Sequence, residues 1–390
     1  MTRIATRLDG IAPFRVMQIL ARARALEAEG HDIVHMEIGE PDFVSPEPVM
    51  AAGRAALLAG KTHYTPAAGL WDLRLAIAEY YHRRFSVEID PGRILVTPGA
   101  SGALQLLLGA IVDPGDRVAV TDPGYPCNRH MIALYGGIPV AIPVSAADDF
   151  TVSSAQLAEA MTGGLRALML ASPANPTGNL VDIQTVAALA DQLAASNDSL
   201  LICDEIYQGL QYDREPQTAL SLRRDNIVVV NSFSKYFGMT GWRIGWIVAP
   251  EWLIDPMERL AQNLFLAAPT LGQYAALAAF SDRTRKILEQ RRREFGLRRD
   301  FMYAALRDIG LVIEHPPSGA FYLYADVSAH AGDCQQFCSD LLDRAGVAVT
   351  PGVDFGNYRA ADHVRFAFTT GLDGLELGVE RIRRFLAAGG

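Results

Sequence analysis

The feature that most constrains the fold is an alternation of strand and helix patterns between Ile94 and Ala249. Helical patterns occur at Ala100–Ile111, Cys127–Leu134, Ser154–Met161 and Val181–Ser196. Seven short aliphatic runs around them are predicted strands: Ile94–Thr97, Arg117–Thr121, Ile138–Ile142, Ala167–Ala171, Leu200–Cys203, Ile227–Asn231 and Ile244–Val248. Such alternation indicates a parallel sheet covered on both faces. We therefore expect an α/β fold whose mainly parallel seven-stranded sheet is sandwiched by helices.

The parts of the chain on either side of this region indicate a second, smaller domain. Before it, the sequence predicts a helix over residues 14–29, a strand at Ile33–Ile38, and helices from Pro46 to about Ala59 and over Leu70–Phe85. After it come a largely helical region (Leu264–Leu306, interrupted at Pro269) and short strands at Leu311–Glu314, Phe321–Ala325, Val347–Val349 and His363–Phe368. A chain of 390 residues exceeds what one core usually supports. We expect a large domain over residues 46–295 and a small α+β domain that combines residues 1–45 with residues 296–390.

The composition excludes several classes of protein. The formal net charge of −9 gives no reason to expect nucleic acid or an anionic membrane as a partner. No apolar run is long enough to span a bilayer, and residues 1–10 lack the apolar core of a signal peptide. The four cysteines are scattered and are expected to be buried thiols, and the histidine pair His31 and His35 lacks a third ligand, so no metal site is expected. We expect a soluble, cytoplasmic protein, with the basic run Arg291–Arg293 on a solvated helix face.

Lys235 stands at the expected carboxyl end of the Ile227 strand, where ligands of open α/β sheets bind. The chain has only three lysines, and arginine cannot replace a lysine that must lose its proton to form an imine. The alternative is a strand-end lysine that is merely solvated. The local sequence leaves both interpretations open.

Other polar residues follow neighbouring predicted strands. Asp204 ends an apolar strand, where a carboxylate is costly to bury unpaired, although aspartate is also a favoured helix N-cap. Asn175 lies in an Asn-Pro-Thr-Gly segment that would serve equally as a plain turn. Tyr207, Ser232 and Arg243 complete the set, and residues 97–102 join a strand to a helix whose free N–H groups favour an anion.

One ligand suits this combination of groups. Pyridoxal phosphate needs an amine for its aldehyde, an anion beside its pyridine nitrogen and a site for its phosphate. Lys235 offers the amine, Asp204 offers the anion, and Ser232 and Arg243 together offer the phosphate site. No GxGxxG or GxxxxGK[ST] motif occurs, so dinucleotide and P-loop sites lack their signature.

In these segments the chain resembles the class I/II aminotransferases, which are fold-type I pyridoxal-phosphate enzymes similar to aspartate aminotransferase. The segments Asn175–Gly178, Asp204–Tyr207 and Ser232–Arg243 match the family in order and spacing, and the resemblance extends from Ile38 to Phe368. It implies that Lys235 is the Schiff-base residue and proton shuttle, and that Asp204 and Tyr207 are catalytic. The remaining cofactor contacts that it implies are Ala100, Ser101, Tyr125, Asn175, Ser232, Arg243 and, from a neighbouring subunit, Tyr64.

The resemblance also implies a function. Arg365 would clamp the substrate α-carboxylate, with contacts from Gly39 and Asn175, in a homodimer with shared sites. The activity would be ping-pong transfer of an amino group between an L-amino acid and a 2-oxo acid. Two other functions stay open: a pyridoxal-phosphate-dependent carbon–sulfur β-lyase on the same fold, and a serine acyl-enzyme that uses Ser232 and Lys235.

The sequence says little about the substrate side chain. Relatives that act on aspartate can place a lysine where this chain has Ser101, and a serine near Phe14. Phe14 and Val16 suit a lid over an aliphatic or aromatic side chain. Arg15 and Arg129 could instead bind a second carboxylate, although we expect both to be solvated surface charges.

Overall fold

The computed structural model describes residues 4–196 and 199–389 and contains the expected sheet. Its seven strands lie in the order β2-β8-β7-β6-β5-β3-β4. Only β8 runs antiparallel to its neighbours, β2 and β7; the other neighbours are parallel. The strands are β2 (Ile94–Thr97), β3 (Arg117–Asp122), β4 (Ile138–Pro143), β5 (Ala167–Ala171), β6 (Leu200–Asp204), β7 (Ile227–Ser232) and β8 (Gly245–Val248). The prediction of a mainly parallel seven-stranded sheet is confirmed.

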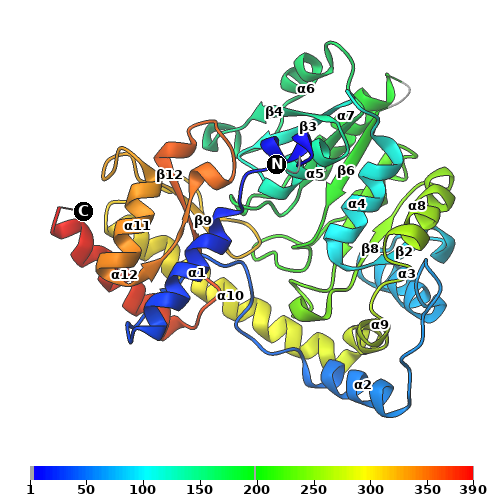
Figure 1. Cartoon of the computed structure of the whole chain (residues 1–390), viewed down its shortest axis with the longest axis horizontal. Coiled ribbons are helices and arrows are strands. Elements are labelled where there is room, and N and C mark those ends of the chain that lie inside the picture. Colours follow the sequence, from blue (N-terminus) through cyan, green and yellow to red (C-terminus); the bar gives the residue numbers. More distant parts are fainter. Residues whose placement is uncertain (1–3, 197–198, 390) are drawn as a thin grey trace.

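Helices pack on both faces of this sheet (Figure 1). Alternate residues of β7 enter different apolar clusters: Ile227 and Val229 belong to one, Val228 and Val230 to the other. Strands buried on both faces explain why the sequence shows continuous apolar runs there rather than alternation. Helices α4 (Gly99–Ile111) and α8 (Glu251–Leu264) supply much of the second cluster. The first includes residues from α2 (Glu47–Leu58), α3 (Trp71–Phe85), α6 (Ser154–Met161), α7 (Ile183–Ala194) and α9 (Thr270–Leu277).

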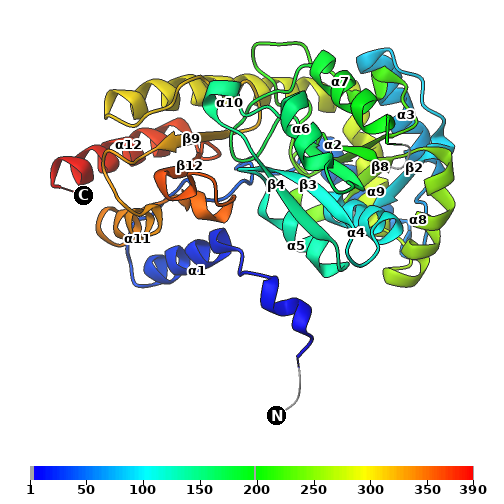
Figure 2. The same cartoon turned by 90° about the horizontal axis from the view of Figure 1, so that it is seen from above.

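The C-terminal part of the chain forms a separate layer on one side of the molecule (Figure 2). It contains the antiparallel sheet β11-β12-β9 and, from the N-terminal segment, strand β1, which pairs with β10 in parallel. The long helix α10 (Asp282–Asp308) runs from the large sheet toward this layer (Figure 1). The strands of this layer are β1 (Val34–His35), β9 (Tyr322–Asp326), β10 (Val347–Ala348), β11 (Thr350–Pro351) and β12 (His363–Ala367). Its other helices are α1 (Arg15–Ala28), α11 (Cys334–Ala345) and α12 (Leu372–Ala387). The domain boundaries expected from the sequence stay predictions.

Three expectations about secondary structure were wrong. The strand expected at Ile33–Ile38 pairs only over Val34–His35, and the run Leu311–Glu314 makes a single bridge, between Val312 and Asp326. An apolar run forms a strand only where a neighbouring strand pairs with it over several residues, and β9 pairs with the run Leu311–Glu314 at a single position. The helical region begins at Glu251 rather than Leu264, and α8 continues through Pro256.

The expectation of a solvated basic run was also wrong in part. Arg293 is exposed, but the guanidinium of Arg291 lies 5.0 Å from the ring centre of Phe43, and Arg292 donates to the main-chain oxygen of Gln211 at 3.0 Å.

Three of the cysteines are buried, and Cys127 is partly exposed. None of the helices in the described part of the chain is long and apolar enough to cross a membrane.

Candidate active site

The carboxyl ends of β3, β5, β6 and β7 open onto one cavity of about 180 Å³. Nine of the twelve site residues expected from the sequence line it: Gly39, Ala100, Ser101, Tyr125, Asn175, Asp204, Tyr207, Lys235 and Arg365. Parallel strands bring residues that are distant in the chain to one edge of a sheet. The described residues contain no group of three or more His, Cys, Asp or Glu side chains placed to hold a metal ion.

Lys235 follows the end of β7 and projects into the cavity. Its Nζ donates to the main-chain oxygen of Gly39 at 2.6 Å, so the ammonium reaches across to the segment that follows β1. Burial lowers the pKa of Lys235 from its ordinary value to about 8, with the positive charges of Arg365 and Arg243 acting in the same direction. A lysine with this pKa exposes a useful fraction of neutral amine near neutral pH, which a solvated lysine does not.

Asp204 is the last residue of β6 and is buried. One carboxylate oxygen accepts from the main-chain N–H of Ile206 at 3.0 Å in a turn, and residues 205–218 contain no helix, so Asp204 is not the helix N-cap of the alternative interpretation. Burial nevertheless raises the pKa of Asp204 to about 6, because this donor and the charge of Lys235 only partly offset the loss of water. A carboxylate in this position is suited to a ligand that brings a positively charged N–H.

An anion-binding surface lies where β2 turns into α4. Gly99 opens α4 with a φ of 71°, and a Cβ there would lie 2.6 Å from Nη2 of Arg243, so only glycine lets the guanidinium approach the helix N-terminus this closely. Arg243 itself has a φ of 55° and donates to Ser234 Oγ at 3.4 Å. Free helix N–H groups together with an arginine favour a phosphate.

Ser232 lies behind this surface rather than on the cavity. Its hydroxyl is buried, 3.1 Å from the main-chain oxygen of Ile244 and 3.0 Å from the hydroxyl of Ser234, which stands between Ser232 and Arg243. Ser234 was not among the predicted site residues, although it lies in the same Ser-Phe-Ser-Lys segment. A buried, hydrogen-bonded Ser232 does not favour the serine acyl-enzyme.

Arg365 on β12 approaches the cavity from the other side. Nη1 donates to Asn175 Oδ1 at 2.9 Å and Nη2 to the main-chain oxygen of Glu37, while Nε is buried and has no hydrogen-bond partner in the described part of the chain. The guanidinium lies between the rings of Tyr322 and Phe355, 4.3 Å and 4.8 Å from their centres. The rings hold the planar group in one orientation, and a free N–H suits a bound carboxylate.

Two tyrosines meet beside this arginine. The hydroxyl groups of Tyr207 and Tyr322 lie 2.8 Å apart, and burial raises the pKa of Tyr207 well above its ordinary value, so it stays a neutral hydrogen-bonding group. Sequence reasoning missed Tyr322. Its signal was an aromatic residue in the predicted strand Phe321–Ala325, but only the tertiary contacts with Tyr207 and with Gly39 give it a place at the site.

The first turn of α1 closes one side of the cavity. Phe14 and Val16 line it, and the ring of Phe14 meets that of Tyr125 edge-on at 6.3 Å between centres. Arg15 and Arg129 do not line it. Both are partly exposed, and each also has a protein partner: Arg15 donates to Gln335, and Arg129 donates to the main-chain oxygen of Asp354.

Tyr64 lies away from the cavity, with 83% of its surface exposed. Its loop is nevertheless held in place by the buried side chain of Gln273, which donates to Thr65 Oγ1 at 2.9 Å and accepts from the N–H of Leu70 at 2.7 Å. The tyrosine therefore points outward from an anchored segment.

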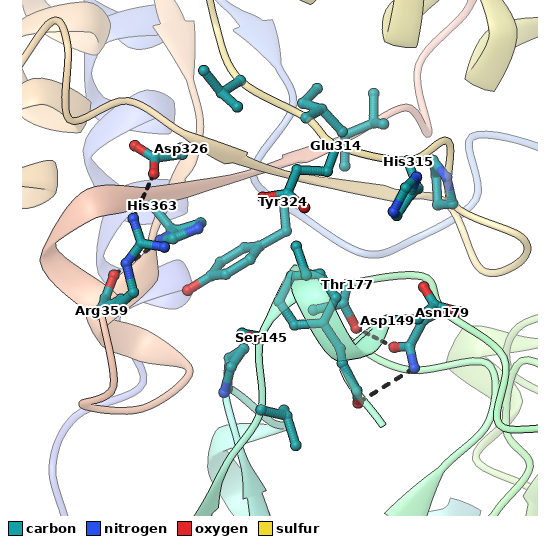
Figure 3. A pocket seen from close by; sticks show the side chains of 18 of the residues that line it. Ser145, Asp149, Thr177, Asn179, Glu314, His315, Tyr324, Asp326, Arg359 and His363 are labelled. Atoms are coloured by element: carbon teal, nitrogen blue, oxygen red, sulfur yellow. Dashed lines mark hydrogen bonds and ion pairs between the residues drawn. The ribbon is translucent and has the colours of Figure 1, made fainter. Parts of the chain in front are cut away.

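A second, smaller cavity of about 70 Å³ lies between the large sheet's loops and the C-terminal layer (Figure 3). Within its lining Arg359 pairs with Asp326 at 2.8 Å, and His363 stacks on Tyr324 at 4.6 Å between ring centres. The buried hydroxyl of Tyr324 has no hydrogen-bond partner among the described residues, and the cavity is large enough for water to supply one. It has neither the lysine nor the free arginine N–H of the first cavity.

Comparisons with known proteins agree with this geometry. The valine–pyruvate aminotransferase of Mycobacterium tuberculosis is 39% identical over 385 residues, with 98% of each chain covered. A crystal structure of an aminotransferase from the same organism superposes with a TM-score of 0.96 at 39% identity over 100% of both chains. The aspartate aminotransferase of Thermus thermophilus with maleate gives 0.93 at 35% identity, covering 98% of this chain and 100% of that one.

A transaminase that is named for a different substrate is similar to this chain over the same length. The (5-formylfuran-3-yl)methyl phosphate transaminase of Methanocaldococcus jannaschii is 36% identical over 385 residues, 98% of this chain and 99% of that protein. The family model described as aminotransferase class I and II matches residues 31–382. The family model spans all three sheets and every residue of the cavity except Phe14, Val16 and Met17. The chain belongs to the aminotransferase class I and II family.

Proposed function

We propose that this transaminase uses pyridoxal 5'-phosphate to move an amino group between an L-amino acid with an apolar side chain and a 2-oxo acid, by a ping-pong mechanism. The observation that carries the proposal is the meeting of Lys235, Asp204 and Arg365 at one cavity. Each supplies a different requirement of the reaction: an amine, an anion and a carboxylate clamp.

The residues present fit pyridoxal phosphate. Asp204 is a buried carboxylate without a cationic hydrogen-bond partner among the described residues, which suits a protonated ring nitrogen. Arg243 packs closely against Gly99 at the start of α4, where it could bind the phosphate, and a larger residue at position 99 would be strained and would displace the guanidinium. Tyr125 offers a ring face at the cavity. When bound there, the cofactor would supply an electron-withdrawing ring that makes the substrate Cα–H acidic.

The chain's own groups would then handle the substrate. Arg365 would bind and orient the α-carboxylate with its guanidinium, which lines the cavity. Lys235 Nζ, with its pKa lowered to about 8, would accept the proton from Cα as a general base and return it as a general acid. Asn175 already gives its carbonyl oxygen to Arg365, which leaves its amide nitrogen to donate to an oxygen of the cofactor ring.

The preference for apolar side chains rests on the cavity wall. Phe14, Val16 and Ile38 line it, and among the described lining residues the only cations are Lys235 and Arg365. A second carboxylate on the substrate would therefore be buried against apolar groups without a partner. The name of the valine–pyruvate relative is consistent with this preference.

The proposal includes a homodimer. Tyr64 is exposed on a loop that Gln273 holds rigid, and a second copy of the chain would place the phenol at the partner's phosphate site. An exposed aromatic on an anchored segment is typical of an interface contact. Sedimentation of the purified protein would test the dimer.

A panel of amino donors assayed with pyruvate and with 2-oxoglutarate would test the function. We expect aliphatic and aromatic amino acids to be used and aspartate to be poor. Release of pyruvate and ammonia from a cysteine conjugate without an oxo-acid acceptor would identify the β-lyase instead. Double-reciprocal plots at several acceptor concentrations should be parallel, and intersecting lines would contradict the ping-pong mechanism.

A further inference from the structure

Helix α1 has no capping side chain of its own. Phe14 occupies the N-cap position and makes no side-chain hydrogen bond to the helix. The first N–H groups of a helix have no partner within it, so each must be satisfied from elsewhere. Because Phe14 and Val16 form part of the cavity wall, the orientation of this first turn decides where that wall stands.

The missing cap comes from Asp354, which is 340 residues away in the chain and buried in the C-terminal layer. Its Oδ1 accepts from the N–H of Arg15 at 3.1 Å and its Oδ2 from that of Val16 at 3.4 Å. A carboxylate at a helix N-terminus is favoured both by these bonds and by the helix dipole.

The segment that follows Asp354 is fixed to the rest of the site. The ring of Phe355 covers the guanidinium of Arg365, and the main-chain oxygen of Phe355 accepts from Gly124 at 2.9 Å. The buried carboxylate of Asp122, at the end of β3, accepts from the N–H of Asn357 at 3.0 Å. One short stretch of backbone therefore touches the apolar wall, the arginine clamp and the loop that carries Tyr125.

We propose that Asp354 is a positioning residue that caps α1 from outside the helix and so sets the distance between the apolar wall and the Arg365 clamp. The distance between these two surfaces decides which side chains fit between an anchored α-carboxylate and the wall. Asp354 itself does not line the cavity, so it acts through Phe14 and Val16. The inference rests on the proposed function and assigns a specificity role that the catalytic residues do not have.

Replacement of Asp354 tests the proposal, with a matched control on the same helix. Asp354→Ala removes both acceptors, and Asp354→Asn keeps one. Asp343→Asn removes the charge of the other carboxylate linked to α1, which forms the 3.0 Å ion pair with Arg22; this pair is exposed and does not line the cavity. We expect kcat/KM for valine relative to alanine to fall about tenfold in Asp354→Ala and about threefold in Asp354→Asn, mainly through KM. The control should leave this ratio unchanged.

Hydrogen–deuterium exchange of a peptide that covers Arg15 and Val16 gives a readout that does not depend on activity. Exchange should be faster than in the wild type in both Asp354 variants, and faster in Asp354→Ala, which loses two acceptors, than in Asp354→Asn, which loses one. It should be unchanged in Asp343→Asn. Unchanged exchange overturns the cap. Faster exchange with an unchanged valine-to-alanine ratio, or an equal loss of kcat for both donors, overturns the positioning role. A wild-type enzyme that transaminates neither donor contradicts the apolar-donor part of the proposed function instead, and the exchange result still decides whether the cap exists.

Discussion

Replacement of Arg365 by lysine gives the sharpest test of how the substrate is held. The guanidinium donates to Asn175 and to Glu37 while its Nε–H stays free, and two rings fix its plane. A lysine keeps the positive charge but cannot serve the protein acceptors and a carboxylate in the same geometry. We expect Arg365→Lys to lose one charge-assisted hydrogen bond to the substrate, worth about 1.5–3 kcal/mol, which is about a 10- to 150-fold loss of affinity.

The assay is competitive inhibition by 3-methylbutanoate, a carboxylate with an apolar tail and no amino group. Its inhibition constant should rise about 10- to 150-fold in Arg365→Lys. Arg344→Lys serves as the control, because Arg344 also stacks on an aromatic ring, that of Phe385, but lies on α11 away from the cavity. Transamination of isobutylamine, which has no carboxylate, should be affected much less than that of valine. An inhibition constant within threefold of wild type, or an equal loss with isobutylamine, would refute the clamp.

Three further predictions concern protonation and the cofactor. Lys235→Ala should abolish both turnover and the absorbance of the imine between Lys235 and the cofactor; a spectrum unchanged from wild type would contradict its assignment as the amine. Cofactor binding by the apoprotein should strengthen as pH rises through about 6, where Asp204 ionises, and Asp204→Asn should remove this dependence and lower kcat about 10²- to 10³-fold. His35 donates to Glu37 and Glu27, and its pKa is raised chiefly by the Glu37 hydrogen bond. A group whose pKa is raised by folding stabilises the folded state fully below its unfolded-state pKa. This stabilisation is lost as pH rises through its folded-state pKa. His35→Gln should therefore lower the free energy of unfolding by about 1 kcal/mol at pH 6 and by less at pH 9, as measured by urea denaturation.

The local sequence was sufficient for the large sheet and for placing Asp204 and Lys235 at its edge, whereas the places of Gly39, Tyr125 and Arg365 at the cavity were expected only from the family resemblance. Strands such as β6 and β7 are buried on both faces, so their apolar runs are visible without tertiary information. Parallel connections then bring their carboxyl ends to one edge, and Asp204 and Lys235 follow from that rule. The edges of the fold were less predictable. The run at Leu311–Glu314 has the composition of a strand, but β9 offers it only one bridging position.

The sequence by itself determined that a lysine, a buried carboxylate and an amide would meet at a sheet edge, because strand periodicity and chain direction are local properties. Only the tertiary structure decided what surrounds them. Tyr322 of β9 reaches the site through a contact with Tyr207 in the turn after β6, Arg15 and Arg129 have partners away from the cavity, and Asp354 caps a helix at the opposite end of the chain. These are contacts between residues far apart in the chain, and nothing in the local pattern of either partner encodes the distance between them.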